Sequence, residues 1–262
     1  MSDETPTASI PRFNVLGVSV SAMNLRIAVA AILDAARAQR KGYICVSGVH
    51  GVTEAQTDAE FRRILNGSFL NTTDGMPLVW LGRHFTKRRI ERVYGPDLML
   101  EMFAATQAVP FRHFFYGGAP GVAEELRESL VTRFPGVQVV GTYTPPFRAL
   151  NAGEQSALAT QVSAARPDMM WVGLSTPKQE RFMAEYLPKL DVTLMAGVGA
   201  AFDFHSGRVR QAPRWVQQSG FEWLYRMCSE PKRLARRYLV NNPLFVWRIA
   251  GQLAGLRKYP LE

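Results

Sequence analysis

Short apolar segments alternate with amphipathic ones along most of this chain, up to about residue 205. Seven apolar segments, rich in β-branched and aromatic residues, are predicted to be strands: residues 14–20, 43–49, 68–74, 112–118, 137–143, 168–174 and 192–199. Predicted helices lie between them, at residues 24–39, 53–67, 96–107, 121–134, 153–165 and 177–187. Apolar strands that each lead into a helix predict an α/β fold, a doubly wound and mostly parallel sheet with helices on both faces.

Polar clusters follow several of the predicted strands. They fall at residues 47–50, 72–74, 117–121, 175–179 and 197–203. In open parallel sheets, ligands bind in the crevice outside the carboxyl ends of the strands. The sequence therefore predicts that these clusters converge on one substrate crevice.

The last part of the chain has a different character. Residues 208–262 contain no predicted strand and three tryptophans, with eleven Lys and Arg against three Glu, so that +8 of the net charge of +9 lies there. We predict a core at 13–207 and a basic, amphipathic helical appendage at 208–262 that packs on the core, a partner or a membrane interface. Residues 1–12 are predicted to be a disordered leader, not a signal peptide. No apolar run approaches the roughly 20 residues that span a bilayer.

Other classes of protein are less well supported. The glycine-rich segments at 116–126 and 197–202 lack the G-x-G-x-x-G pattern, which disfavours an NAD-dependent oxidoreductase, and GLSTP at 173–177 lacks the second glycine of a hydrolase nucleophile elbow. No spacing of His, Asp, Glu or Cys predicts a metal site, and two distant cysteines fit a reducing cytoplasm. No nucleic-acid module is present, so the basic appendage is predicted to face anionic lipid or a lipid diphosphate. The basic segment RHFTKRR at 83–89 is interpreted as a solvated loop.

The segment NTTDGMPLVWLGR, residues 71–83, contains one carboxylate, Asp74, at the end of a predicted strand. One interpretation is a helix N-cap, because Asp accepts hydrogen bonds from first-turn amides and Pro77 suits the start of a helix. The other is a catalytic carboxylate at the edge of the sheet. Local sequence leaves both open.

Six segments, taken in order, resemble the WecG/TagA/CpsF family of bacterial glycosyltransferases, over roughly residues 13–240. They are EFRRILNGSFLNTTDGMPLVWLGR, ERVYGPDLM, FFYGGAPGVAEE, VGLSTPKQERF, GVGAAFDFHSG and APRWVQQSGFEWLYR with EPKRLARRY. The resemblance implies a Rossmann-like catalytic core. It also implies an inverting transferase that moves a sugar from a UDP-sugar to a polyprenyl-diphosphate-linked saccharide, without a metal or other cofactor. It also implies a cytoplasmic, peripheral position on the inner face of the membrane, in cell-surface or extracellular polysaccharide synthesis.

The resemblance also implies roles for individual residues. Asp74 is matched to the proposed general base. Residues matched or assigned to the donor site are Ser47, Gly48, His50, Arg92, Gly117, Gly118 and Gln179. Arginines matched to those proposed to complete the site over the diphosphate are Arg226, Arg233 and Arg236.

One position departs from the family pattern. Many members have T-x-N after the second strand, where this chain has Val46, Ser47 and Gly48, with Ser47 and His50 as candidate replacements for the asparagine. The donor sugar therefore stays open, as does a homo-oligomeric state. The remaining alternative from another class is a non-catalytic, membrane-associated protein that binds a nucleotide sugar.

Overall fold

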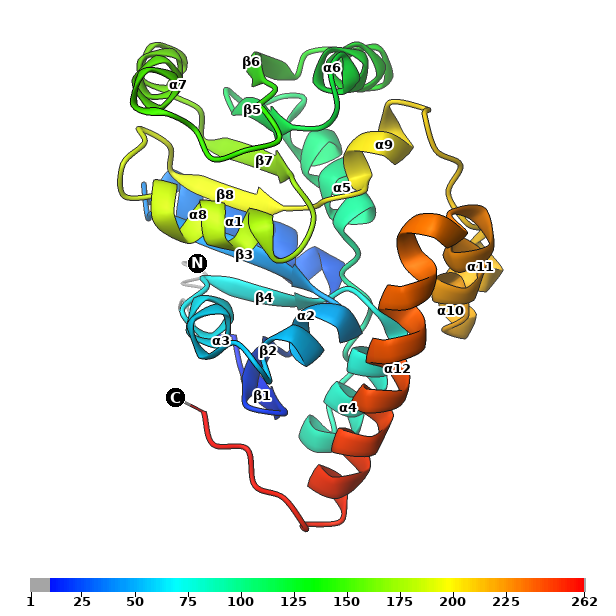
Figure 1. The fold of residues 1–262 in the computed structure, drawn as a ribbon. Helices are drawn as coiled ribbons and strands as arrows, with labels where there is room; N and C mark the ends of the chain where they lie inside the picture. The colour runs from blue at the N-terminus through cyan, green and yellow to red at the C-terminus, as the bar shows by residue number, and fades with distance from the viewer. Residues whose placement is uncertain (1–9, 262) are drawn as a thin grey trace.

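The structure, a computed structural model, describes residues 10–261. Six strands form a parallel sheet in the order β4-β3-β8-β7-β5-β6 (Figure 1). They are β3 (Gly42–Ser47), β4 (Leu70–Thr73), β5 (Arg112–Gly117), β6 (Gln138–Tyr143), β7 (Met169–Gly173) and β8 (Leu194–Gly197). Every pairing between neighbours is parallel, which confirms the predicted α/β class and six of the seven predicted strands.

The prediction of a single strand at residues 14–20 is wrong. This segment belongs to an antiparallel hairpin of β1 (Arg12–Val15) and β2 (Val18–Ser21), outside the main sheet. Leu16 and Gly17, which join the strands, both have positive φ angles, 53° and 79°. Two-residue hairpin turns of this kind need positive φ at both positions, so glycine here turns the chain back. The described part of the predicted leader already enters β1 at Arg12, and residues 1–9 lie outside the described residues.

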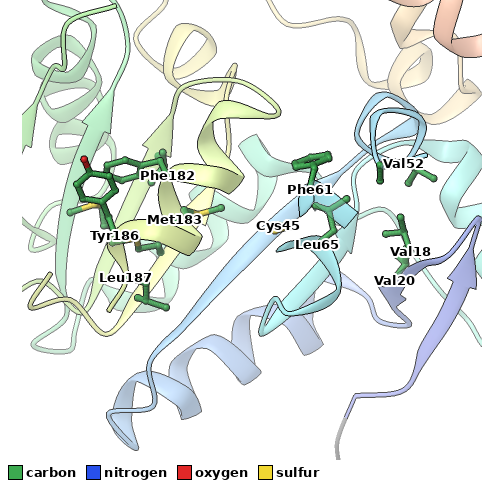
Figure 2. Close-up of a cluster of buried hydrophobic side chains, with 14 of the residues drawn as sticks. Val18, Val20, Cys45, Val52, Phe61, Leu65, Phe182, Met183, Tyr186 and Leu187 are labelled. Atoms are coloured by element: carbon green, nitrogen blue, oxygen red, sulfur yellow. The ribbon is translucent and has the colours of Figure 1, made fainter. Parts of the chain in front are cut away.

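Helices cover both faces of the sheet because the strand residues alternate between two cores. Cys45 of β3 lies in one core, and its neighbours Ile44 and Val46 lie in the other. The Cys45 core includes α3 (Ala59–Asn66), α7 (Ala152–Ala165), α8 (Lys178–Tyr186) and the hairpin, and Figure 2 shows part of it. The opposite core includes α1 (Leu25–Arg37), α5 (Gly95–Thr106), α6 (Val122–Arg133) and the short α9 (Ala201–His205).

The predicted helix at 53–67 is two helices, α2 (Val49–Glu54) and α3. The break has a local cause. The side chain of Asp58 accepts a hydrogen bond of 2.9 Å from the Phe61 amide and so caps a new helix start.

The described part of the C-terminal segment, residues 208–261, contains three helices and no strand. They are α10 (Arg214–Ser219), α11 (Glu222–Ser229) and α12 (Pro231–Leu253), which continues through Pro243. In Figure 1, α12 lies along the core beside α4 (Met76–Thr86) and near α2. Leu234, Phe245 and Ile249 are the buried face of α12. Among residues 10–261, no helix is long and apolar enough to cross a membrane.

Candidate active site

Asp74 lies at the carboxyl edge of the sheet. Its amide donates a 2.9 Å hydrogen bond to the carbonyl of Ser47, which extends the β3–β4 ladder by one residue. Gly48, next along from Ser47, lies so close that a Cβ added there would be 3.5 Å from Oδ2 of Asp74. The ends of two neighbouring strands therefore meet at this carboxylate, as expected for parallel strands.

The cap interpretation of Asp74 is wrong for the helix that follows it. The N-cap of α4 is Gly75, and no side chain caps that helix. The backbone amide of Gly95, at the start of α5, instead lies near the Asp74 carboxylate and acts to lower its pKa. The carboxylate therefore lies at the positive end of a helix distant in sequence, where an anion is stabilised.

Arg92 is held beside Asp74 by the segment that follows α4. The hydroxyl of Thr72 donates to the Val93 carbonyl at 3.0 Å, and that of Thr73 donates to the Glu91 carbonyl at 2.9 Å. These bonds fix the backbone on both sides of Arg92. The Arg92 Nε then donates to the backbone carbonyl of Asp74.

Glu222, from α11, completes this arrangement. Its carboxylate lies 2.5 Å from Nη2 of Arg92 and accepts a 2.8 Å hydrogen bond from the Tyr94 hydroxyl. The Arg92 guanidinium also stacks over the Tyr94 ring, 3.9 Å from its centroid. The C-terminal segment therefore contributes a buried side chain to the surroundings of Asp74.

Burial raises the pKa of Asp74 above its ordinary value. The positive charge of Arg92 opposes this rise, the negative charge of Glu222 adds to it, and Arg226 and the Gly95 amide oppose it. A carboxylate with a raised pKa holds a proton more tightly than an exposed aspartate. It is therefore a stronger base in the range where it is ionised.

Two cavities meet at Asp74. The larger, of about 620 Å³, lies between the core and the C-terminal segment, and the smaller, of about 80 Å³, lies beyond the ends of β7 and β8. Four side chains line both: Asp74, Tyr94, Arg226 and Arg237. The carboxylate and two arginines thus stand where two bound groups would meet.

The walls of the two cavities differ in chemistry. The larger is bounded by apolar side chains of α4 and α12, among them Met76, Pro77, Leu81, Phe245 and Ile249. The smaller is bounded by Ser175, by Gln179 and by the glycine-containing turn 197–200. One cavity is therefore suited to an apolar chain, and the other to a small polar group.

Gln179 is fixed in the wall of the smaller cavity. Its Nε2 donates to Oε1 of Glu180 at 3.1 Å, and the Thr176 hydroxyl donates to the same oxygen at 2.8 Å. Gly197 and Gly199 pack against the Gln179 amide, where an added Cβ would lie 3.0 Å and 3.4 Å from it. The Gln179 Oε1 is buried and has no hydrogen-bond partner among residues 10–261. It is a hydrogen-bond acceptor without a donor.

The other predicted donor-site residues are distributed unevenly. Gly48 and His50 line the larger cavity, and Ser47 is buried and lines neither. Gly117 and Gly118 also line neither. A Cβ on Gly117 would lie 2.6 Å from the carbonyl oxygen of Gly173. Gly117 is therefore explained by the close approach of β5 to β7, where it pairs with Gly173. The structure does not bring these two glycines together with Asp74.

His50 connects the core to α12. Its Nδ1 lies 2.8 Å from Nδ2 of Asn241, which donates to it when the ring is neutral. Burial, followed by the positive charge of Arg237, lowers the pKa of His50 to about 4. His50 is therefore neutral at physiological pH and holds the C-terminal segment in place as a hydrogen-bond acceptor.

Similarity to known proteins identifies the family of this chain. The profile of the glycosyl transferase WecG/TagA/CpsF family matches residues 13–259. The chain belongs to this family. A similar protein is the N-acetylglucosaminyldiphosphoundecaprenol N-acetyl-beta-D-mannosaminyltransferase of Bacillus spizizenii, 30% identical over 193 residues, which are 74% of this chain and 72% of that protein. The Bacillus subtilis protein of the same name is 28% identical over 179 residues, 68% of each chain.

In this WecG/TagA/CpsF glycosyltransferase the arginines of α11 and α12 are not equivalent. Arg226 lines both cavities, whereas Arg236 is exposed and lines neither. The side chain of Arg233 lies outside the described residues. Arg237, which the sequence motifs did not single out for the site, lines both.

Sequence reasoning missed Tyr94, Glu180, Glu222 and Arg237 as residues of the site. Tyr94 and Glu180 stand beside matched residues, in ERVYG and PKQER, where position alone gives a weak signal. Glu222 reaches Arg92 across 130 positions of the chain, and no local pattern could have shown that contact.

Proposed function

We propose that this glycosyltransferase moves a sugar from a UDP-sugar to a polyprenyl-diphosphate-linked saccharide, with inversion at the anomeric carbon. The observation that carries the proposal is Asp74, which stands between an apolar cavity and a polar one. The names of the Bacillus relatives support it, since they describe the transfer of N-acetylmannosamine to a diphosphoundecaprenol-linked N-acetylglucosamine. The product would enter a cell-surface or extracellular polysaccharide.

The two cavities suit the two substrates. An acceptor with a polyprenyl chain and a diphosphate needs apolar walls beside cations, and the larger cavity offers α4 and α12 with Arg226 and Arg237. A donor sugar needs fixed polar groups, and the smaller cavity offers Gln179 and Ser175. A hydroxyl of the acceptor saccharide and the anomeric carbon of the donor would then meet beside Asp74.

The chemistry is a single displacement. The acceptor oxygen attacks the anomeric carbon from the face opposite UDP, the new C–O bond forms, and the bond to UDP breaks. The Asp74 carboxylate takes the proton of the attacking hydroxyl, and the electron pair leaves with the diphosphate of UDP. Negative charge therefore grows on that diphosphate in the transition state.

Arginines can meet this charge without a metal. Arg226 and Arg237 both reach the junction of the cavities. Arg92 is already ion-paired with Glu222, so its larger part is to hold the backbone of Asp74. Among residues 10–261, no group of three or more His, Cys, Asp or Glu is placed to hold a metal ion. Metal independence is itself part of the proposal.

The proposed location is the inner face of the cytoplasmic membrane, with peripheral attachment to its anionic surface. The segment from α10 to α12 exposes large apolar side chains among its basic residues, including Trp215, Phe221, Leu239, Val246 and Trp247. Amphipathic basic helices bind in the plane of an anionic interface. A homo-oligomeric state stays a prediction.

Turnover with defined substrates tests the function. Purified protein is mixed with a panel of UDP-sugars and a short-chain polyprenyl-diphosphate N-acetylglucosamine, with and without EDTA. UDP release that needs both substrates, survives EDTA and yields the opposite anomer by NMR supports the proposal. Binding of a UDP-sugar without release would favour the non-catalytic alternative, and a fluorescence titration with NADH tests the oxidoreductase.

A further inference from the structure

Basic residues are concentrated in two segments that contain no acidic residue. Residues 76–90 comprise α4 and the loop after it, and residues 231–261 comprise α12 and the tail after it. Together they hold eleven Lys and Arg and no Asp or Glu, a charge of +11 against +9 for the whole chain. The rest of the protein therefore sums to −2. Only one of these two segments belongs to the C-terminal appendage.

The two segments lie side by side in space. Trp80 and His84 of α4 line the larger cavity together with Val246 and Leu253 of α12, and Figure 1 shows the two helices next to each other. Three of these apolar side chains are about half exposed: Trp80 at 51%, Val246 at 66% and Leu253 at 49%. The larger cavity thus opens to the surface between α4 and α12, with an apolar rim.

Basic side chains flank this rim on both sides. Lys87 and Arg88, directly after α4, are exposed, and none of the ion pairs found in residues 10–261 involves either of them. Beyond α12, the Arg257 guanidinium lies 4.3 Å from the centroid of the Trp247 ring, which is 57% exposed. Aromatic and aliphatic side chains interleaved with cations are typical of surfaces that enter the headgroup region of a bilayer.

We propose that residues 76–90 of the core are a second membrane-docking element, which faces the anionic surface of the bilayer together with α12. The inference rests on the proposed function for the presence of a membrane, and extends it by assigning the contact to the catalytic core. Both a bilayer and a nucleic acid would offer phosphates to these basic side chains. Only a bilayer would also bury the exposed apolar side chains Val246 and Leu253, so the surface favours a bilayer.

This docking would place the bilayer across the mouth of the larger cavity. An acceptor chain could then pass from the membrane between α4 and α12 towards Asp74 at the inner end. A membrane bound by α12 alone would leave the α4 wall of the cavity facing water. The interpretation of residues 83–89 as a loop is wrong for residues 83–86, which belong to α4. The docking would replace the solvated surface in that interpretation with a membrane contact.

The test is vesicle flotation with the full-length protein. Vesicles of pure phosphatidylcholine are compared with vesicles containing 30% phosphatidylglycerol, a composition chosen for about the charge of a bacterial inner leaflet. The test variant is Lys87→Glu with Arg88→Glu. The matched control is Arg26→Glu with Arg127→Glu, the same charge change at exposed positions of α1 and α6. Thermal melts check that both variants fold.

Wild type and control are expected to float with the anionic vesicles alone. A basic side chain near an anionic surface contributes a factor of about five. The test variant loses two of them and gains two negative charges, so it should bind at least about 25-fold more weakly. Equal loss in the test and control variants, or no loss in either, would overturn the proposal. Lack of flotation by wild type would also overturn the proposal, and membrane attachment would no longer be part of the proposed function. The proposed sugar transfer would still be tested separately, by turnover of a detergent-dispersed acceptor. Binding of polyuridylate in place of vesicles, lost in the test variant, would assign the surface to nucleic acid.

Discussion

The carboxylate of Glu222 lies 2.5 Å from the guanidinium of Arg92, although the two residues belong to the C-terminal segment and the core. Both side chains are largely buried, at 11% and 16% exposure. Removing one partner of a buried ion pair leaves the other charged and unpaired, which costs about 3–5 kcal/mol. Correct placement of Arg92 therefore depends on the docking of α11.

Glu222→Ala is expected to loosen the C-terminal segment and to lower kcat/KM at least tenfold, because Arg92 also holds the Asp74 backbone. Glu222→Gln, which keeps acceptor and size, should lose less. The measurements are urea unfolding, limited trypsinolysis within residues 208–261, and initial rates. The exposed Glu128→Ala on α6 is the matched control. Wild-type trypsin resistance and rates in Glu222→Ala would contradict the coupling.

Two adjacent arginines of α12 provide a second test. Arg237 lines both cavities, whereas Arg236 is exposed and lines neither. Arg237→Ala is expected to lower kcat by about 10²-fold, as loss of one donor to a developing charge does. Arg236→Ala should leave kcat within about threefold and affect membrane binding instead. Equal loss of kcat in the two variants, assayed with a detergent-dispersed acceptor, would show that proximity to the cavities does not decide the role.

Helical geometry explains why Arg237 faces the cavities and Arg236, which the motif matched, does not. Leu234, Phe245 and Ile249 are buried and define the inward face of α12. Arg237 follows Leu234 by three residues and therefore shares this face, whereas Arg236 is rotated by about 200° from Leu234. A motif match transfers a position along the chain, but it does not tell which of two neighbours faces inward. The apolar spacing in the sequence carried that information.

Features that depend on neighbouring residues were predictable from the sequence, and those that depend on residues far apart in the chain were not. The six sheet strands were predictable because each is a local apolar segment. The position of Asp74 at the edge of the sheet was predictable because it follows one of these strands. The hairpin was missed because its turn has only two residues, Leu16 and Gly17. Both are apolar, so the sequence pattern does not separate them from the strands on either side. Contacts such as Glu222 with Arg92 and Asn241 with His50 join residues 130 and 191 positions apart. Tertiary packing alone creates them.

The amide of Gln179 gives a prediction about donor binding. Glu180 accepts a hydrogen bond from the Gln179 Nε2, which turns the Gln179 oxygen away from Glu180. Glu180→Gln removes this preference, so the amide can present either end to a ligand. We expect KM for the UDP-sugar to rise about 3- to 10-fold, the worth of one net hydrogen bond, with a smaller change in kcat. Glu185→Gln, exposed on the same helix, is the control. An unchanged donor KM in Glu180→Gln would count against the fixed amide.

His50 predicts a loss of stability in mild acid. Burial and then Arg237 lower the pKa of His50 to about 4, so the unfolded chain takes up this proton near pH 6.5 while the folded protein does not. Stability contributed by neutral His50 is therefore present above about pH 6.5 and is lost as pH falls towards 4, by up to about 3 kcal/mol.

The measurement is urea unfolding from pH 7.5 to 4.5 in wild type and in His50→Gln, whose side-chain oxygen can still accept from Asn241. Burial also lowers the pKa of His113, to about 3, and lowers the pKa of His205, so three histidines should destabilise wild type in acid and two should destabilise the variant. The difference between the two curves isolates His50. Parallel curves would mean that His50 titrates normally.

Asp74→Asn separates chemistry from folding. Loss of a general base is expected to lower kcat by about 10²–10⁴-fold. Because burial raises the pKa of Asp74, the folded protein binds this proton more tightly than the unfolded chain does. Ionised Asp74 therefore costs stability at neutral pH, and the cost disappears as pH falls from the raised pKa to the ordinary value of 3.8. The neutral asparagine should leave Tm at pH 7 unchanged or higher.

The pH profile of kcat/KM gives the second half of this prediction. Wild-type activity should fall in acid with an apparent pKa above that of an exposed aspartate, since the base must be ionised. Gly48→Asn puts an amide donor beside Oδ2 of Asp74, at a position whose φ of −110° any residue can adopt. A hydrogen bond to the ionised form stabilises it, so the acidic limb should move to lower pH. A limb that stays in place in Gly48→Asn, or near-normal kcat in Asp74→Asn, would assign the base to another group.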